Sequence, residues 1–324
     1  MKKVSYTKRI IASLILTVFV GGGVATSANV SANTTATSGI KTESVTKKVN
    51  TKTNSSEKKK DFNKSSKKHL GQNWLKNRPI LEEIAESAII MADDPKSCQP
   101  LCLEIGPGLG TLTSSLLRRF PKVLAVEYDK KLATNLPKSF PGKNLEVIHQ
   151  DFLQFDLEQI KEPYVVVGNI PYYITSPIIQ KLISAKNPPQ RIVLLMQKEV
   201  ADRLLFDVGK YTYLTLAVLN FADVLPGIFV DRSLFTPPPK VDSASVILIP
   251  RVQPIVNITV LCFIKQCFMN PRKKLITCLP HIVQKTREGI KEIYQKLNFD
   301  ENFRPADLTL FDWQKLYDLT QSNN

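Results

Sequence analysis

The stretch LCLEIGPGLG, residues 101–110, decides the fold of this chain. Its first half is a short apolar run, Leu101 to Ile105, and its second half places glycine at every other position. Residues 111–120 follow with the apolar spacing of a helix. A strand, a glycine turn and a helix in this order form the opening unit of a doubly wound nucleotide-binding fold, in which glycine lets the backbone approach a ligand closely.

Further strands and helices surround that unit. A helical period covers residues 80–91, and four more apolar runs predict strands at 123–126, 145–148, 164–168 and 192–196. Strands that alternate with helices predict a mainly parallel sheet whose carboxyl edge carries the ligand. Four polar residues stand at or just beyond successive strand ends, and we expect them along one rim: Glu104, Glu127, Asp151 and Asn169.

The pattern changes after Pro250, where helices are predicted at 263–268, 282–297 and 308–319. We therefore predict an α/β protein with a doubly wound, Rossmann-like domain at 69–250 and a small helical domain at 251–324. The 43% hydrophobic content is ample for a packed core and excludes a wholly disordered chain.

The net charge of +15 is unevenly distributed. Residues 1–60 hold 11 Lys and Arg against 2 Asp and Glu, whereas the rest of the chain holds 33 against 27. The globular part is therefore only mildly basic, which fits an RNA-binding protein without establishing one. Five cysteines, an odd number without zinc-type spacing, argue against a disulfide framework and a metal site and favour a reducing compartment.

The acidic rim residues suit S-adenosylmethionine as a cofactor. Glu104 can receive its positively charged amino acid end, beside a backbone turned by Gly106 and Gly108. Glu127 can accept both ribose hydroxyls, as a carboxylate does in NAD-binding folds, and Asp151 can accept from the adenine amine. The alternative for any one of these acids is a solvated loop charge.

The sequence Asn169-Ile170-Pro171-Tyr172 suits methylation of an adenine amine. The lone pair of such an amine is delocalised into the ring, and two acceptors pointed at its hydrogens favour a pyramidal nitrogen. The Asn169 side chain and the Ile170 carbonyl offer those acceptors, while Pro171 fixes the backbone. Tyr172 offers a flat face for a base that has left its helix or loop. The alternative is an ordinary strand-to-helix turn.

With these motifs assembled, the chain resembles the KsgA family of ribosomal RNA adenine dimethyltransferases. The matching pieces lie between Leu70 and about Leu316 in the family's order: LGQNWL at 70–75, Glu104 to Gly110, Glu127, Asp151, Asn169 to Tyr172, QKEV at 197–200 and FTPPPKVDSA at 235–244. One departure is Trp74, where the family usually has Phe. The resemblance implies the fold of class I methyltransferases.

The resemblance also implies roles for individual residues. Cofactor contacts are implied for Asn73, Leu75, Gly106, Glu127, Asp151 and Asn169. Phe235 would sandwich the target adenine against Tyr172. The substrate would be two adjacent adenosines in the hairpin loop near the 3′ end of small-subunit rRNA, within an immature ribosomal subunit. Each adenosine would receive two methyl groups from an enzyme that we expect to be monomeric.

Other functions stay open. Erm-type methyltransferases share the fold and the Asn-Ile-Pro-Tyr chemistry but modify large-subunit rRNA, and folded RNA is recognised by surface shape and phosphate contacts that these motifs do not encode. A non-catalytic ribosome assembly factor is a second alternative. Arg272, Lys273 and Lys274 are candidate phosphate contacts in the helical domain, or else a solvated basic turn.

The first residues of the chain predict export, which conflicts with a cytoplasmic enzyme. A basic start, an apolar run from Ile10 to Val20 and the small residues before Asn33 are the parts of a secretory signal at 1–32. A Ser-, Thr- and Lys-rich linker at 33–68 is predicted to be disordered. This leader alone predicts an exported protein. A secreted or anchored variant, a mis-assigned start and a fused leader are the alternatives, and we expect a cytoplasmic core enzyme without a membrane partner.

Overall fold

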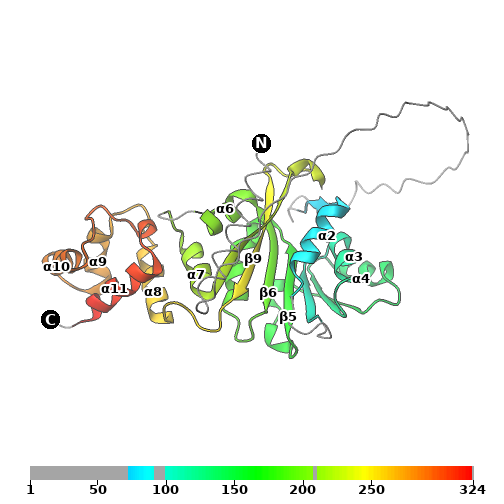
Figure 1. Cartoon of the computed structure of the whole chain (residues 1–324), viewed down its shortest axis with the longest axis horizontal. Helices are drawn as coiled ribbons and strands as arrows, with labels where there is room; N and C mark the ends of the chain where they lie inside the picture. The colour runs from blue at the N-terminus through cyan, green and yellow to red at the C-terminus, as the bar shows by residue number, and fades with distance from the viewer. Residues whose placement is uncertain (1–71, 91–98, 207–209, 323–324) are drawn as a thin grey trace, which may run out of the picture. The chain divides into compact units, whose positions relative to one another are not determined.

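The computed structural model describes residues 72–90, 99–206 and 210–322 (Figure 1). The predicted leader at 1–32, the linker at 33–68 and the first two residues of LGQNWL lie outside the described residues. Within the described part, every regular element after Pro250 is a helix, and no helix is both long and apolar enough to cross a membrane.

In the described residues the central sheet has seven strands in the order β4-β3-β2-β5-β6-β9-β7. Their bounds are β2 Leu101–Ile105, β3 Val123–Glu127, β4 Leu145–His149, β5 Tyr164–Asn169, β6 Arg191–Gln197, β7 Ala222–Val230 and β9 Ser243–Pro250. The first five in this order run parallel, and β9 pairs antiparallel with both β6 and β7. β5, β6 and β9 can be followed side by side in Figure 1. The predicted doubly wound α/β fold is confirmed.

Strands β7 and β9 fall where the sequence predicts no strand. β7 contains Pro226 and Gly227, and such residues normally argue against a strand. They lie at a β-bulge, where the Ile228 N–H donates to the Ser245 hydroxyl at 2.7 Å. A Cβ at position 227 would lie 2.1 Å from that hydroxyl oxygen, so glycine is required there.

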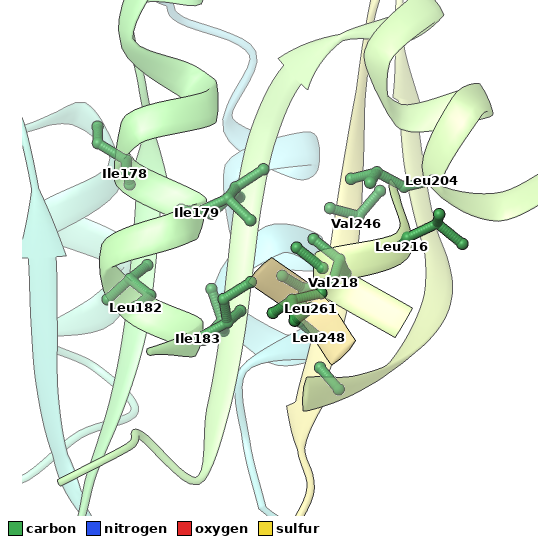
Figure 2. Packing of buried hydrophobic residues seen from close by; sticks show 14 of the residues in the cluster. Ile178, Ile179, Leu182, Ile183, Leu204, Leu216, Val218, Val246, Leu248 and Leu261 are labelled. Carbon is green, nitrogen blue, oxygen red and sulfur yellow. The ribbon is translucent and has the colours of Figure 1, made fainter. Parts of the chain in front are cut away.

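Helices cover both faces of the sheet, as alternate residues of β5 show. Val166 belongs to a buried cluster with side chains of α5 (Thr175–Ile183) and α7 (Tyr213–Phe221), several of which Figure 2 labels. Val165 and Val167 belong to the opposite cluster, with side chains of α2 (Arg78–Ser87) and α3 (Thr111–Leu116). A strand buried on both faces reads as a continuous apolar run, which is why the sequence identifies it. The other helices of this part are α4 Lys130–Ser139 and α6 Lys198–Phe206.

The helical end consists of α8 (Ile258–Cys267), α9 (Leu275–Val283), α10 (Arg287–Leu297) and α11 (Leu310–Gln321). The single helix predicted at 282–297 is wrong, because Gln284 adopts a left-handed conformation with φ 54° and ends α9. Thr286 then caps α10 by accepting from the Gly289 N–H at 3.1 Å. The predicted helices at 80–91 and 111–120 are also shorter, ending at Ser87 and Leu116.

Candidate functional site

A cavity of about 290 Å³ opens at the carboxyl ends of β2, β3 and β5. The parallel register of these neighbouring strands ends them at the same edge of the sheet. All four predicted rim residues line this cavity, which confirms that they lie along one edge. The predicted site residues that line it are Asn73, Glu104, Gly106, Gly108, Glu127, Asp151, Asn169, Pro171 and Tyr172.

The glycine turn after β2 forms the floor of the cavity. Gly108 has φ 58°, a conformation that side chains rarely adopt, and a Cβ there would lie 3.3 Å from Nε1 of Trp74. Its N–H donates to Oε2 of Glu127 at 3.0 Å. Glycine at this position therefore lets Trp74 approach the turn. The N–H bond to Glu127 holds the turn against the end of the next strand.

Glu127 is buried and held in one orientation. Its Oε1 accepts from the Asp129 N–H at 2.7 Å, while Oε2 accepts from Gly108. Burial raises the pKa of Glu127, and the backbone hydrogen bonds from Asp129 and Gly108 oppose that shift. A carboxylate with one lone pair of each oxygen engaged retains acceptor capacity for a ligand with two hydroxyls.

Glu104 is buried without equivalent support. It is 1% exposed, and its Oε2 has no hydrogen-bond partner among the described residues. Burial raises its pKa to about 8; Thr113 opposes the shift, whereas the Glu127 carboxylate adds to it. A buried acceptor left unsatisfied is costly unless a ligand supplies a donor or a positive charge. An ammonium group in the cavity would supply both.

Asp151 begins the turn that forms another part of the cavity lining. The turn is the short 3-10 helix η3 (Phe152–Gln154), and Oδ1 of Asp151 caps it by accepting from the Leu153 N–H at 2.9 Å. Phe152 and Leu153 also line the cavity. The cap engages one carboxylate oxygen and fixes the orientation of the other.

Asn169 ends β5, and its Nδ2 donates to the Asn73 carbonyl at 3.2 Å. This bond assigns the nitrogen to the Asn73 side, so the Oδ1 acceptor points away from that carbonyl. Pro171 then precedes the 3-10 helix η5 (Tyr172–Ile174), which leads into α5. The Tyr172 hydroxyl lies 2.7 Å from Oγ of Ser243, a residue of β9 with no exposed surface. Burial raises the pKa of Tyr172, and the hydrogen bond with Ser243 opposes that shift.

Two of the residues predicted to contact the cofactor or the target base lie outside the cavity lining. Leu75 and Phe235 are paired directly across a two-stranded sheet, β1 (Trp74–Leu75) with β8 (Phe235–Thr236). They are 1% and 3% exposed and belong to the cluster beneath α2 and α3. They adjoin the cavity because Leu75 directly follows Trp74, which lines it. The cofactor contact of Leu75 and the stacking role of Phe235 stay predictions.

The three predicted RNA contacts lie on the surface, in the turn between α8 and α9. Arg272, Lys273 and Lys274 are all exposed, and Lys274 Nζ donates to Oδ1 of Asn302 at 2.6 Å. Their role stays a prediction. Among the described residues, no group of three or more His, Cys, Asp or Glu could hold a metal ion.

Sequence reasoning missed several residues of the site. Ser243 is an unremarkable serine until its strand is placed beside Tyr172. Tyr128 and Tyr173 line the cavity yet are 61% and 64% exposed, an unusual position for aromatic rings. Both directly follow a predicted site residue, so their place in the sequence was the available signal.

Known proteins match this chain over most of its length. Residues 63–313 match the model of the family described as ribosomal RNA adenine dimethylase. A ribosomal RNA small subunit methyltransferase A from Mesomycoplasma hyopneumoniae is 38% identical over 261 residues, covering 79% of this chain and 97% of the relative. One from Alkaliphilus metalliredigens is 35% identical over 263 residues, covering 77% and 90%.

Two solved structures are also similar. A dimethyladenosine transferase from Plasmodium falciparum has a TM-score of 0.61 and 31% identity, covering 75% of this chain and 95% of that one. The 23S rRNA methyltransferase ErmE has the same TM-score and 28% identity, covering 77% and 100%. Both proteins share the architecture of this chain.

Proposed function

The chain belongs to the ribosomal RNA adenine dimethylase family, and we propose that it dimethylates two adjacent adenosines in the 3′-terminal hairpin loop of small-subunit rRNA. The relatives named small subunit methyltransferase A support this choice of substrate, because they are at least 35% identical over most of their length. Proteins of this family are methyltransferases that use S-adenosylmethionine. The observation that carries the proposal is that the acidic rim and Asn169-Ile170-Pro171-Tyr172 line one cavity.

The residues of the rim fit S-adenosylmethionine. The buried, unpartnered Oε2 of Glu104 suits the ammonium of the amino acid end, beside the backbone of Gly106 and Gly108. Glu127 would accept the ribose hydroxyls and Asp151 the adenine amine. Asn73 and Asn169, which line the cavity, would add further contacts, and a contact from Leu75 would require this buried residue to become accessible. When bound, the cofactor supplies an electrophilic methyl group.

The other end of the cavity suits the target base. Oδ1 of Asn169 and the Ile170 carbonyl would accept hydrogen bonds from the target amine. They would favour a pyramidal nitrogen, whose lone pair is free to attack the methyl group. Pro171 holds the backbone between them and Tyr172, and the hydroxyl contact to Ser243 holds the Tyr172 ring ready for stacking. Phe235 would complete the sandwich, which requires its now buried ring to become accessible.

RNA recognition would involve the helical part, at 251–324. Residues 251–287 hold seven Lys and Arg and no Asp or Glu, and Arg272, Lys273 and Lys274 form the densest part of that basic stretch. Phosphate contacts of this kind position an RNA without reading its sequence. We place the enzyme in the cytoplasm, acting as a monomer on an immature small subunit and contributing to its assembly.

One experiment tests the enzyme and its substrate together. Purified protein, labelled S-adenosylmethionine and immature small subunits should give labelled dimethyladenosine in the 3′-terminal hairpin. RNA binding without label would favour the assembly-factor alternative instead.

The likeness to ErmE keeps large-subunit rRNA as a second candidate substrate. Mapping of dimethyladenosine in rRNA from cells with and without the gene separates the two. Loss of the modification from the large subunit alone would overturn the small-subunit proposal.

A further inference from the structure

A lysine outside the cavity holds one of its walls in place. Lys181 lies on α5, the helix that follows Asn169-Ile170-Pro171-Tyr172, and it is half-buried. Its Nζ donates to the Leu153 carbonyl at 2.8 Å and to the Phe155 carbonyl at 2.5 Å. The same atom lies 5.4 Å from the centre of the Phe152 ring. One charged group thus contacts three residues of the turn that begins at Asp151.

Lys181 and Asp151 both bind the backbone of the same turn. Oδ1 of Asp151 accepts the N–H of Leu153, and Lys181 binds the carbonyl of that same residue. Leu153 is therefore held at both ends of its backbone, although 36% of it is exposed where it lines the cavity. Beneath it, the rings of Phe152 and Phe155 stack at 6.3 Å with an interplanar angle of 20°.

One ammonium group faces two carboxylates in this neighbourhood. Burial lowers the pKa of Lys181, and the carboxylates of Asp151 and Asp156 oppose that shift. A neutral side chain at position 181 would leave two turn carbonyls without their donor and Asp151 without a nearby positive charge. The turn carries the carboxylate assigned to the cofactor's adenine, so a loosened turn would affect that contact first.

We propose that Lys181 is a positioning residue for the adenine end of the cofactor site, acting through the turn from Asp151 to Phe155. The proposal rests on the proposed use of S-adenosylmethionine. It also links the two ends of the cavity, since α5 starts directly after the residues assigned to the target base and reaches back to the cofactor wall.

Calorimetric titration with S-adenosylmethionine tests this in three variants of the full chain. Lys181→Met keeps the aliphatic stem but removes the donors, and we expect its Kd to rise about tenfold. Lys181→Arg keeps donors and charge, and we expect a Kd within about threefold of wild type. Lys186→Met is the matched control, because Lys186 lies just beyond α5 and pairs at the surface with Glu158 at 3.0 Å.

Turnover separates positioning from general structure. At saturating cofactor, kcat of Lys181→Met should stay within about threefold of wild type, and its KM for RNA should not change. A wild-type Kd in Lys181→Met overturns the inference. So does a fall in kcat as large as the rise in Kd, or loss of the folded state in both Lys181 variants. If the wild-type protein itself binds no S-adenosylmethionine, the proposed function fails instead.

Discussion

The two ends of the cavity are built differently. At the cofactor end, Glu127 accepts from Gly108 and Asp129, and Asp151 accepts from Leu153, all backbone groups no more than 19 residues away in sequence. At the base end, Asn169 is held by Asn73, 96 residues away, and Tyr172 by Ser243, 71 residues away. At the first end the carboxylates accept from nearby backbone N–H groups, and Lys181 holds the Asp151 turn. At the second end the partners are at least 71 residues away in sequence.

This difference suggests how damage at each end should show itself. Backbone donors and Lys181 fix the carboxylates of the cofactor end, so substitutions of these carboxylates or of Lys181 should act on cofactor affinity. At the base end Asn169 and Tyr172 are oriented by distant groups, so substitution of Asn169 itself, or of Ser243, the side-chain partner of Tyr172, should act on turnover. If the two ends are separable in this way, cofactor affinity and turnover should respond to different substitutions.

Removal of the Asn169 side chain should have the largest effect. Asn169→Ala removes an acceptor proposed for the target amine, and we expect transfer to fall up to about a thousandfold, the upper end of the 10²–10³ that a catalytic hydrogen-bonding group commonly contributes. Cofactor Kd should stay within about tenfold, some 1.4 kcal/mol. Labelled methyl transfer and calorimetry measure the two, with Asn144→Ala, a surface asparagine bonded to the Pro121 carbonyl, as control. Wild-type turnover in Asn169→Ala would refute the acceptor role.

Glu127→Gln should produce the reverse pattern. An amide places an N–H against one of the two backbone donors that now bind the carboxylate, and it removes the charge that favours ribose hydroxyls. We expect cofactor Kd to rise about a hundredfold, or roughly 2.7 kcal/mol. The control is Glu146→Gln, an exposed glutamate on β4 that pairs with Lys122 at 3.6 Å. Unchanged affinity in Glu127→Gln would remove the ribose assignment.

The same division explains what the sequence predicts well. Glu104, Glu127 and Asp151 lie at or just beyond the ends of apolar runs, and a parallel sheet brings successive strand ends to one edge, so periodicity alone places them together. Ser243 and the Asn73 carbonyl could not be found that way, because their contacts depend on the register of β9 and on the path of the chain before α2. β7 could not be predicted, because Pro226 and Gly227 argue against a strand and are accommodated only by the bulge in its pairing with β9.

The unsatisfied Glu104 predicts a pH dependence of the ligand-free protein. Its pKa is raised from 4.5 to about 8, so between these values the folded state retains a proton that the unfolded state has released. This contribution to stability is complete below about pH 4.5 and is lost as pH rises through about 8. We expect Glu104→Gln to remove up to about 1.4 kcal/mol per pH unit of downward slope in the free energy of unfolding.

Denaturant unfolding at pH 6, 7 and 8 measures that slope in the wild-type protein and in Glu104→Gln. Other titrating groups are common to both proteins, so their contributions cancel when the two slopes are subtracted. Equal slopes would show that Glu104 ionises normally in the folded protein. Such a result would mean that Glu104 is already a carboxylate at neutral pH and needs no ammonium group to ionise it.

The smallest effect is expected from Ser243→Ala, which tests the base end from a distance. It removes the partner of the Tyr172 hydroxyl, a neutral hydrogen bond worth about 1 kcal/mol, so kcat should fall roughly fivefold while cofactor Kd stays unchanged. Tyr172→Phe keeps the ring but loses the same bond, and combining the two substitutions should cost little more than either alone. Ser233→Ala, at an exposed serine bonded to Asp231, is the control. Additive losses in the double variant, or a change in Kd, would show that Ser243 acts on the site by another route and that the two ends are not separable.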